Sequence, residues 1–280
     1  MGTLFLVATP IGNLEDMSPR AVRILREVQL IAAEDTRHTR QLLTHFDIHT
    51  PLTSYYEHNK LAKLDAILTA LSRGNVALVS DAGTPAINDP GYELVMAALS
   101  AQHMVSPVPG PSAPIAALSA SGLPTDSFLY LGYLPRKTSE RKALFERVGH
   151  LPYTLIFLES PHRVLDSLAD MQAFLGDRRM TAARELTKVY EELVRGSISE
   201  VMAHFSANEV RGEFVLVVGG ETHNPATEQW PENYVTAAIQ RELATGRQLK
   251  DIAVELARRS GWTRREIYKM ALEFQADQLE

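Results

Sequence analysis

Short apolar runs rich in β-branched residues recur along the chain, and amphipathic segments separate most of them. Seven such runs predict buried strands, at residues 3–8, 28–33, 75–80, 103–108, 128–132, 153–159 and 213–219. Ser18-Pro19, Asp89-Pro90 and Ser160-Pro161 each place a capping side chain before a proline that can open a helix. Alternation of strands and helices is typical of parallel sheets, so the sequence predicts an α/β protein.

Two polar segments divide this pattern into blocks. The turn-rich stretch 122–127 separates two α/β blocks, and the stretch 221–233 has the proline-containing, polar composition of a linker. We therefore expect an N-terminal α/β domain over 1–123 and a second α/β domain over 124–224. The remaining residues, 225–280, are expected to form a small helical region.

The last region carries the periodicity of two short amphipathic helices. Apolar residues recur at helical spacing in 249–256 and again in 267–274, and Gly261 suits the turn between them. Thr263 and Glu266 have the spacing of a capping box that starts the second helix. This helix-turn-helix pattern fits either a bundle docked on the main body or a surface that contacts nucleic acid.

Composition excludes several classes of protein. The 280 residues are 45% hydrophobic and include no cysteine, which excludes disulfides, thiolate zinc sites and a cysteine nucleophile. No apolar run approaches the roughly 18 residues of a membrane span, and the first residues lack the basic segment of a signal peptide. We therefore expect a cytoplasmic protein with no membrane partner. Glycine-rich nucleotide-binding motifs, G-x-S-x-G and H-E-x-x-H are absent, and the scattered histidines argue against a metal site.

Positive charge is concentrated in two segments of an acidic chain. The net charge is −6, whereas residues 241–269 alone carry +4, and a second basic segment spans 135–142. Such segments suggest a polyanionic partner, although solvated surface charge is the alternative. The candidate nucleic-acid contacts are Arg136, Lys137, Arg141, Lys142, Arg264, Arg265 and Lys269.

Four polar turns follow predicted strands and indicate a ligand site. They span residues 8–16, 33–40, 80–91 and 107–114. Ligands of α/β proteins bind beyond the carboxyl ends of the strands. Glu34, Asp35, Asp81 and Asp89 lie in these turns, so the site suits a ligand with positive charge better than a bare polyphosphate. We interpret Asp89 as the cap of the following helix and Asp81 as the residue that faces the ligand.

Six stretches between Thr9 and Lys188 resemble the tetrapyrrole-methylase-like class of S-adenosylmethionine enzymes. They are "TPIGNLEDMSPRA", "LIAAEDTRHT", "LVSDAGTPAINDPG", "PGPSAPIAALSASGLP", "LIFLESPHR" and "ARELTK". Relatives that methylate tetrapyrroles have a glycine-rich first loop, whereas this chain has "ATPIGNL", so the resemblance is strongest to the ribosomal RNA branch. It implies two α/β domains with the cofactor in the cleft between them, usually in a homodimer.

The resemblance also implies a cofactor, a reaction and a substrate. The cofactor is S-adenosyl-L-methionine, and the reaction is methyl transfer to a cytidine ribose 2′-hydroxyl in 16S rRNA of the small ribosomal subunit, near the decoding site. The cofactor-binding residues implied are Pro10 or Ile11, Asp81, Gly83, Thr84, Ser112, Ala113, Phe157 or its neighbour, and Leu186.

Such a reaction gains from a base that accepts the hydroxyl proton. The candidate bases are Glu34, Asp35, Glu159, Glu185 and Lys188, while Arg37 and Arg184 are suited to hold phosphate or orient a carboxylate. We rank Glu34, Asp35 and Arg37 first as catalytic residues, because three charged side chains crowd one strand end. Asp35 can instead cap the helix that begins at Thr36.

Two alternatives to this function stay open. One is a methyltransferase of the same fold with another substrate, such as diphthine or a tetrapyrrole. The other is a ligand-sensing regulator that binds DNA through the helix-turn-helix pattern.

Overall fold

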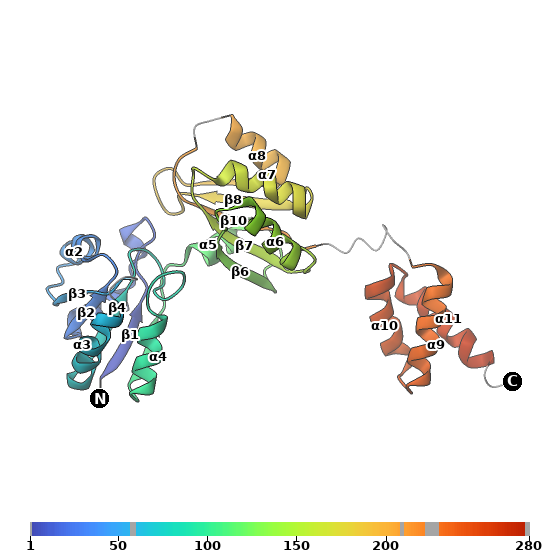
Figure 1. The fold of residues 1–280 in the computed structure, drawn as a ribbon, viewed down its shortest axis with the longest axis horizontal. Helices are drawn as coiled ribbons and strands as arrows, with labels where there is room; N and C mark the ends of the chain where they lie inside the picture. Colours follow the sequence, from blue (N-terminus) through green and yellow to red (C-terminus); the bar gives the residue numbers. More distant parts are fainter. Residues whose placement is uncertain (1, 57–59, 208–209, 222–229, 278–280) are drawn as a thin grey trace. The chain divides into compact units, whose positions relative to one another are not determined.

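The computed structural model describes residues 2–56, 60–207, 210–221 and 230–277 (Figure 1). By its internal contacts the chain divides into two compact units, Met1–Glu221 and Thr222–Glu280. The predicted domain boundary near residue 225 lies outside the described residues. Each unit is described by itself below.

The first sheet of the larger unit is parallel, as the alternating pattern predicted. Its strand order is β3 (Leu52–Ser54), β2 (Leu30–Ala33), β4 (Val76–Val79), β1 (Thr3–Val7) and β5 (Met104–Val108). Its helices are α1 (Pro19–Glu27), α2 (Thr36–His45), α3 (Lys60–Arg73) and α4 (Tyr92–Ser100), with a short 3-10 turn η1 (Leu14–Asp16) before α1. Side chains alternate along each strand, so Val7 packs with α1 and α2 while Leu4 packs with α3 and α4. Apolar residues on both faces explain why these strands read as continuous apolar runs.

The second sheet is mixed, which corrects the expectation of parallel sheets throughout. Its order is β6 (Phe128–Tyr133), β7 (Thr154–Glu159), β10 (Phe214–Val218), β8 (Arg179–Arg184) and β9 (Glu192–Ser197). Only β6 and β7 pair in parallel, and the other neighbours are antiparallel. The strands β8 and β9 form a hairpin across residues 185–191, and a hairpin forces antiparallel pairing.

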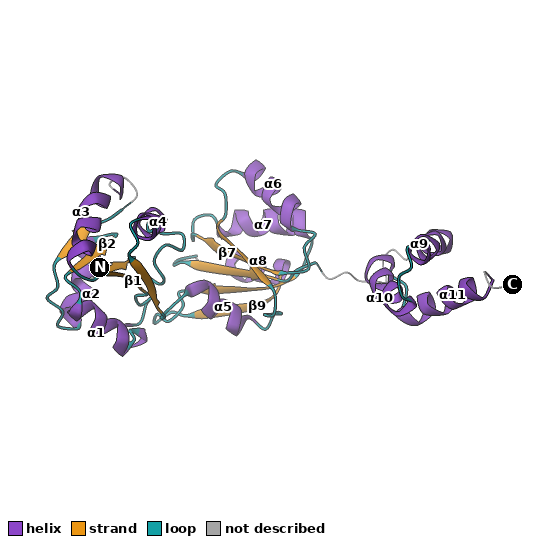
Figure 2. Ribbon diagram, turned by 90° about the horizontal axis from the view of Figure 1, so that it is seen from below, coloured by secondary structure: helices purple, strands orange, loops and turns teal. Residues whose placement is uncertain are grey.

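Helices cover both faces of the second sheet (Figure 2). One face packs against α6 (Thr138–Val148), α7 (Val164–Leu175) and α8 (Ile198–Ser206). The other face packs against α5 (Ala113–Ser121), through Ala117 and Leu118. The helix α5 therefore lies in the first predicted domain by sequence but packs on the second sheet. Because the chain passes from β5 of the first sheet to α5 on the second sheet, the loop between them lies next to both sheets.

One of three predicted helix caps is confirmed and two are wrong. Ser18 caps α1, because its hydroxyl accepts a hydrogen bond of 3.1 Å from the Ala21 amide, and Pro19 opens the helix. The helix α4 begins only at Tyr92, after Gly91, and no side chain caps it. The helix α7 begins at Val164, beyond the predicted Ser160-Pro161 start. Neither Asp89 nor Ser160 therefore caps a helix, and both make other contacts: Asp89 accepts a hydrogen bond from Ser80, and the Ser160 amide donates to Glu159.

The smaller unit is a bundle of three helices around its own apolar core. The helices are α9 (Glu232–Ala244), α10 (Leu249–Ser260) and α11 (Arg264–Asp277). Val235, Ile239, Ile252 and Ile267 are fully buried in its core. The predicted glycine turn and capping box are confirmed: Gly261 has φ 69°, and the Thr263 amide donates to Glu266 Oε2 at 2.8 Å. None of the helices in the described part of the chain is long and apolar enough to cross a membrane.

Candidate functional site

A cavity of about 270 Å³ lies at the strand ends of the larger unit. Loops of the first sheet supply Ile11, Glu34 and residues 81–84 and 87–89 to its lining. The second sheet and its loops supply Tyr130, Tyr133, Leu158, Glu159, residues 183 and 185–186, Lys188 and residues 213–215, and the start of α5 supplies residues 112–114. Both sheets therefore build one site.

Three carboxylates form one wall of this cavity. Glu34 follows β2 and Asp81 follows the neighbouring β4, whose residues Ala33 and Val79 are paired. The Asp81 side chain accepts a hydrogen bond of 3.0 Å from the Asp35 amide, and the Asp81 amide donates to the Glu34 carboxylate. These two bonds hold the Asp81 and Glu34 side chains at the sheet edge. The third carboxylate, Asp89, comes from the loop that follows β4.

Burial and mutual repulsion change the protonation of this wall. Burial raises the pKa of Glu34 above its usual 4.5, and the negative charges of Asp89 and Asp81 raise it further. Burial likewise raises the pKa of Asp89, although a hydrogen bond from Ser80 acts in the opposite direction. A ligand that carries positive charge would relieve the repulsion. Among the described residues, no group of three or more His, Asp or Glu has the arrangement of a metal site.

The structure separates the three predicted catalytic residues. Only Glu34 lines the cavity. Asp35 caps α2 through a hydrogen bond of 2.8 Å from the Arg37 amide, and Arg37 Nη2 lies 2.7 Å from Asp35 Oδ2. These contacts with Arg37 hold the pKa of Asp35 below its usual value, so its carboxylate is a weak base. The capping interpretation of Asp35 is confirmed, and its placement does not support a catalytic role for Asp35 or Arg37.

Most of the residues expected to bind the cofactor lie together at the cavity. They are Ile11, Asp81, Gly83, Thr84, Ser112, Ala113 and Leu186. Pro10 is outside the lining. Phe157 is fully buried in the core beneath α6 and α7, whereas its neighbour Leu158 lines the cavity, because adjacent residues of a strand face opposite sides.

Backbone contacts hold the loops of the first sheet together. Thr9 and Gly83 form an antiparallel bridge, with amide-to-carbonyl distances of 2.9 and 3.0 Å. The Thr84 hydroxyl donates to the Pro111 carbonyl at 3.1 Å, which links the loop after β4 to the loop after β5. Gly83 has φ 82°, a conformation that favours glycine. These bonds present backbone groups at the cavity floor in a fixed arrangement.

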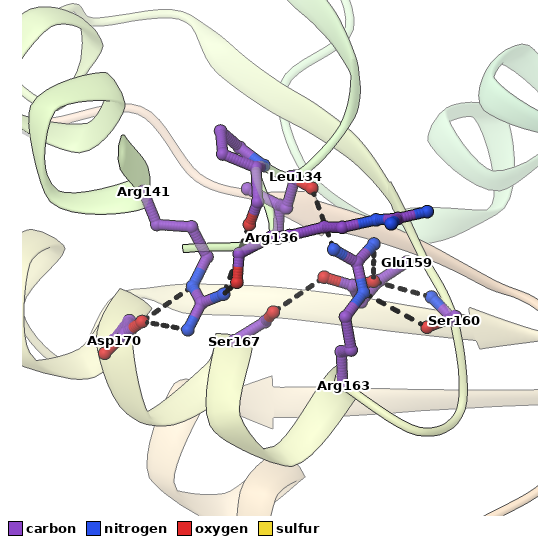
Figure 3. A network of polar contacts seen from close by, with 9 residues as sticks. Leu134, Arg136, Arg141, Glu159, Ser160, Arg163, Ser167 and Asp170 are labelled. Carbon is purple, nitrogen blue, oxygen red and sulfur yellow. Dashed lines mark hydrogen bonds and ion pairs between the residues drawn. The ribbon is translucent and has the colours of Figure 1, made fainter. Parts of the chain in front are cut away.

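Glu159 has a structural task at the edge of the cavity (Figure 3). Its fully buried carboxylate accepts hydrogen bonds from the Ser160 amide at 2.7 Å and the Ser167 hydroxyl at 2.6 Å. Arg163 Nη2 lies 2.6 Å from the same carboxylate, and Arg163 Nη1 donates to the Leu134 carbonyl at 3.3 Å. The network ties the end of β7 to the start of α7 and to β6. A carboxylate with these partners is poorly suited to accept a proton from a substrate.

The candidates Glu185 and Lys188 neutralise each other. Lys188 Nζ lies 2.8 Å from Glu185 Oε1, and the Glu213 amide donates to the same oxygen at 3.1 Å. These hydrogen bonds lower the pKa of Glu185. The pKa of Lys188 is raised by Glu185 and Glu213, although burial opposes the rise. Neither shift favours a base at neutral pH.

Arg141 was predicted to contact nucleic acid, but its side chain is buried in a network of polar contacts (Figure 3). Its side chain is only 5% exposed, and its Nε lies 2.6 Å from Asp170 Oδ2. The Pro135 and Arg136 carbonyls accept from its Nη1 at 3.1 and 2.9 Å. It is therefore a buried tie between the start of α6 and α7, and it is not accessible to a polyanion. The other six predicted contacts, namely Arg136, Lys137, Lys142, Arg264, Arg265 and Lys269, are exposed.

Two tyrosines at the cavity were missed by sequence reasoning. Tyr130 and Tyr133 are three residues apart, so a regular strand would place them on opposite faces. The pairing of β6 with β7 shifts register between them, at Gly132 with φ 67°, and both then line the cavity. Burial raises the pKa of Tyr130 to about 12. Gly132 ends the predicted strand, whereas the observed strand continues through it to Tyr133, and a glycine within a strand indicates a bulge.

The larger unit thus consists of two α/β halves that share one cavity at their strand ends. The family of Tetrapyrrole (Corrin/Porphyrin) Methylases matches residues 3–202, and the chain belongs to this family. Solved structures agree in fold. Diphthine synthase is 14% identical with a TM-score of 0.59, over 79% of this chain and 91% of that one. Uroporphyrin-III C-methyl transferase from Thermus thermophilus, complexed with S-adenyl homocysteine, is 21% identical with a TM-score of 0.54, over 78% of this chain and 97% of that one.

Within the family, the chain is similar over nearly its full length to curated proteins named ribosomal RNA small subunit methyltransferase I. The protein of that name from Synechocystis sp. is 47% identical over 99% of this chain and 100% of its own. The one from Halalkalibacterium halodurans is 46% identical over 96% and 94%. The one from Xylella fastidiosa is 45% identical over 95% and 98%.

Proposed function

We propose that this protein is an S-adenosylmethionine-dependent methyltransferase of small-subunit ribosomal RNA. In the full form of the proposal, it methylates a cytidine ribose 2′-hydroxyl near the decoding site, in the cytoplasm where that substrate is found. The observation that carries the proposal is the 47% identity over 99% of the chain to a ribosomal RNA small subunit methyltransferase I. A diphthine or tetrapyrrole substrate is less well supported, because the two solved structures with such names described above are only 21% and 14% identical.

The cavity residues fit the chemistry of this cofactor. S-adenosylmethionine carries an ammonium, a sulfonium, ribose hydroxyls and an adenine, and when bound it supplies an activated methyl group. Asp81 and Asp89 offer negative charge to the cationic groups, and the backbone around Gly83 offers hydrogen bonds to the hydroxyls. Ile11 and Leu186 offer apolar surface to the adenine. Because the methyl group is already activated, the protein contributes mainly by aligning the two substrates.

Glu34 is the residue best placed to accept the 2′-hydroxyl proton. It is the one member of the predicted catalytic set that lines the cavity, and the Asp81 amide orients its carboxylate. Its raised pKa brings it closer to the neutral range, where a general base is most effective. We assign the proton acceptor to the carboxylate of Glu34.

Exposed cations outside the cavity would hold the RNA backbone. Arg136 and Lys137 follow β6, whose Tyr133 lines the cavity. Arg264, Arg265 and Lys269 lie on the exposed side of α11 in the smaller unit. Such side chains neutralise phosphates and give affinity without reading sequence.

A second copy of the chain would cover an apolar stripe on α4. Tyr92, Met96 and Leu99 are 67%, 46% and 52% exposed and follow one helical face, and Met104 of the edge strand β5 is 70% exposed. A stripe of this size beside an open sheet edge is typical of an interface. We therefore infer a homodimer through this face. Analytical sedimentation is expected to give a dimer, and a monomer at micromolar concentration would contradict the inference.

The test of the function is methyl transfer from radiolabelled cofactor to purified small ribosomal subunits. We expect Glu34→Gln to lower kcat about 10²–10⁴-fold, because the base is lost, while calorimetry gives nearly unchanged S-adenosylhomocysteine affinity. Glu27→Gln on the exposed surface of α1 is the control and is expected to match the wild type.

Two results would contradict different parts of the proposal. If the wild type transfers no methyl group to subunits and instead binds one DNA duplex sequence tightly, the protein is a regulator and the proposed function is wrong. If the wild type is active and Glu34→Gln is equally active, only the role of Glu34 is wrong.

A further inference from the structure

The loop between β8 and β9 contributes some residues to the cavity lining and exposes others to solvent. Glu185, Leu186 and Lys188 line the cavity. At the tip, Val189 is 92% exposed and Tyr190 is 76% exposed. Two large apolar side chains therefore stand at the rim of the site, and the fold buries little of either.

Hydrogen bonds within the loop hold this tip, although two of its residues have an unfavourable backbone conformation. The Thr187 amide donates to Glu191 Oε2 at 2.6 Å, and the Lys188 and Glu191 amides donate to carbonyls within the loop at 3.0 and 3.1 Å. Glu185 and Thr187 have φ of 51° and 65°, which side chains adopt only at a cost. The hydrogen bonds within the loop offset that cost and hold the backbone on both sides of Val189 and Tyr190.

The first loop of the chain supports the same segment from the other side. A Cβ at Gly12 would collide with the Lys188 side chain and lie 3.0 Å from the Leu186 carbonyl oxygen. Gly12 therefore permits a close approach between the loop after β1 and the loop that carries Tyr190. The tip is a built part of the site and not a free surface loop.

Charge at the rim indicates which part of an RNA the tip can contact. Lys188 is paired with Glu185 and Glu213, and Arg184 Nη2 lies 2.8 Å from Glu192 Oε2. The side chains of Lys188 and Arg184 are only 32% and 22% exposed, unlike those of Lys137 and Lys269, and both are matched by carboxylates, which disfavours a phosphate beside the tip. The uncharged face of a nucleobase suits an exposed aromatic ring, because every base can stack on it.

We propose that Tyr190, with Val189 beside it, is a stacking platform for a nucleobase of the substrate RNA next to the methylated nucleotide. This inference rests on the proposed function. A ribose can enter the cavity only if the strand around it is unstacked, and an aromatic ring at the rim replaces the stacking that a neighbouring base loses. Tyr190 positions the strand and takes no part in the chemical step.

The test compares four full-length variants in the subunit methylation assay. We expect Tyr190→Ala to raise the KM for small subunits about tenfold or more, which is the usual effect of removing one stacking ring. Tyr190→Trp should stay close to the wild type, and Tyr190→Leu should resemble Tyr190→Ala, because leucine keeps apolar bulk without an aromatic face. Tyr153→Ala, at an exposed tyrosine away from the cavity lining, is the control.

Three further measurements separate the possible roles of Tyr190. S-adenosylhomocysteine affinity, sedimentation and thermal unfolding of Tyr190→Ala should equal those of the wild type. A weaker S-adenosylhomocysteine affinity would make Tyr190 a cofactor contact, and a change from dimer to monomer would make it part of a protein interface. Either result would overturn the proposal. It would also be overturned if Tyr190→Ala and Tyr190→Leu both kept the wild-type KM for small subunits. If the wild type itself does not methylate subunits, the proposed function fails and this inference fails with it.

Discussion

At the scale of single residues, the carboxylates Glu34 and Asp89 at the cavity oppose folding at neutral pH. Burial raises the pKa of both Glu34 and Asp89, and Asp81 repels each of them. An acid whose pKa is higher in the folded than in the unfolded state stabilises the protein most at low pH. That stabilisation is lost as the pH rises through the raised pKa, so at neutral pH both side chains oppose folding. A cationic ligand would reverse their effect.

Replacing Asp89 should therefore separate stability from binding. We expect Asp89→Asn to raise the unfolding midpoint of the ligand-free protein at pH 7.5, on the order of 2 °C, and to weaken cofactor binding. The rise should shrink as the pH is lowered to 4, because the raised pKa of Asp89 makes the wild-type carboxyl bind a proton as the pH falls. Thermal unfolding at both pH values, with calorimetry for the cofactor, measures the two effects.

Asp177 provides a control of opposite sign for this prediction. Its carboxylate accepts hydrogen bonds of 2.7 Å from both the amide and the hydroxyl of Ser199, and these lower its pKa. Its stabilisation is present above the usual pKa and is lost as the pH falls, so Asp177→Asn should lower the midpoint at pH 7.5. An Asp89→Asn variant that is also less stable at pH 7.5 would contradict the unfavourable role of Asp89.

At the scale of elements, a buried ion pair fixes α6 against α7. Arg141 on α6 and Asp170 on α7 are joined at 2.6 Å, with side-chain exposures of 5% and 17%. Arg141 also donates to the Thr138 hydroxyl at 3.0 Å and to two carbonyls of the β6–α6 loop. The same side chain therefore sets both the helix contact and the loop that carries Arg136 and Lys137.

Removing Arg141 should destabilise the protein without a direct effect on RNA affinity. We expect Arg141→Ala to lower the free energy of unfolding by about 3 kcal/mol, because Asp170 is left buried without its partner. Lys142→Ala, at the next and exposed position, should change it by less than about 0.5 kcal/mol. Urea unfolding measures both. An Arg141→Ala variant of wild-type stability with a raised KM for subunits would restore Arg141 as an RNA contact.

Strands with a continuous apolar run could be predicted from the sequence, whereas short or polar strands and their pairing could not. All seven predicted strands are present, because each has an apolar run that the core requires. The strands β3, β8 and β9 were missed, since "LTS", "RMTAAR" and "ELVRGS" are too short or too polar to form such a run. The helix α9 was missed because the expected linker covered its start. Hairpin pairing of β8 with β9 is not encoded in periodicity, so the mixed second sheet could not be foreseen.

The prediction of the candidate site was right for residues close to a strand end and wrong for a residue farther along an irregular loop. Asp81 and Gly83 directly follow a strand, so their place at the sheet edge could be predicted. Asp89 follows nine residues of irregular loop, including Ala86 and Asn88 at φ 65°, and only the folded backbone turns it toward the cavity. The proline after Asp89 suggested a cap, but α4 begins later.

At the scale of the whole molecule, the cavity and the basic helix α11 belong to different units. The larger unit contains the whole cavity lining and the hydrophobic cores of both sheets. The smaller unit has a separate core, which Trp262 closes by donating from Nε1 to the Trp230 carbonyl at 2.8 Å. Neither core requires residues of the other unit. The cations of α11 do not line the cavity, so their proposed contribution to polyanion affinity can be tested separately from cofactor binding.

This division predicts what removal of the smaller unit should do. A chain that ends at Glu221 should bind S-adenosylhomocysteine with wild-type affinity, because the cavity lining is complete within it. Its kcat/KM for small subunits should fall at least about tenfold, since the phosphate contacts of α11 are lost.

Substituting Arg264, Arg265 and Lys269 together by alanine in the full chain should give a similar loss and a shallower dependence of KM on salt, by about two to three phosphate contacts. Replacing Glu232 and Gln240 of α9 by alanine is the matched control and should change neither quantity. Full activity of both the shortened chain and the triple variant would show that the larger unit recognises the RNA alone, and the basic residues of α11 would then be solvated surface charge.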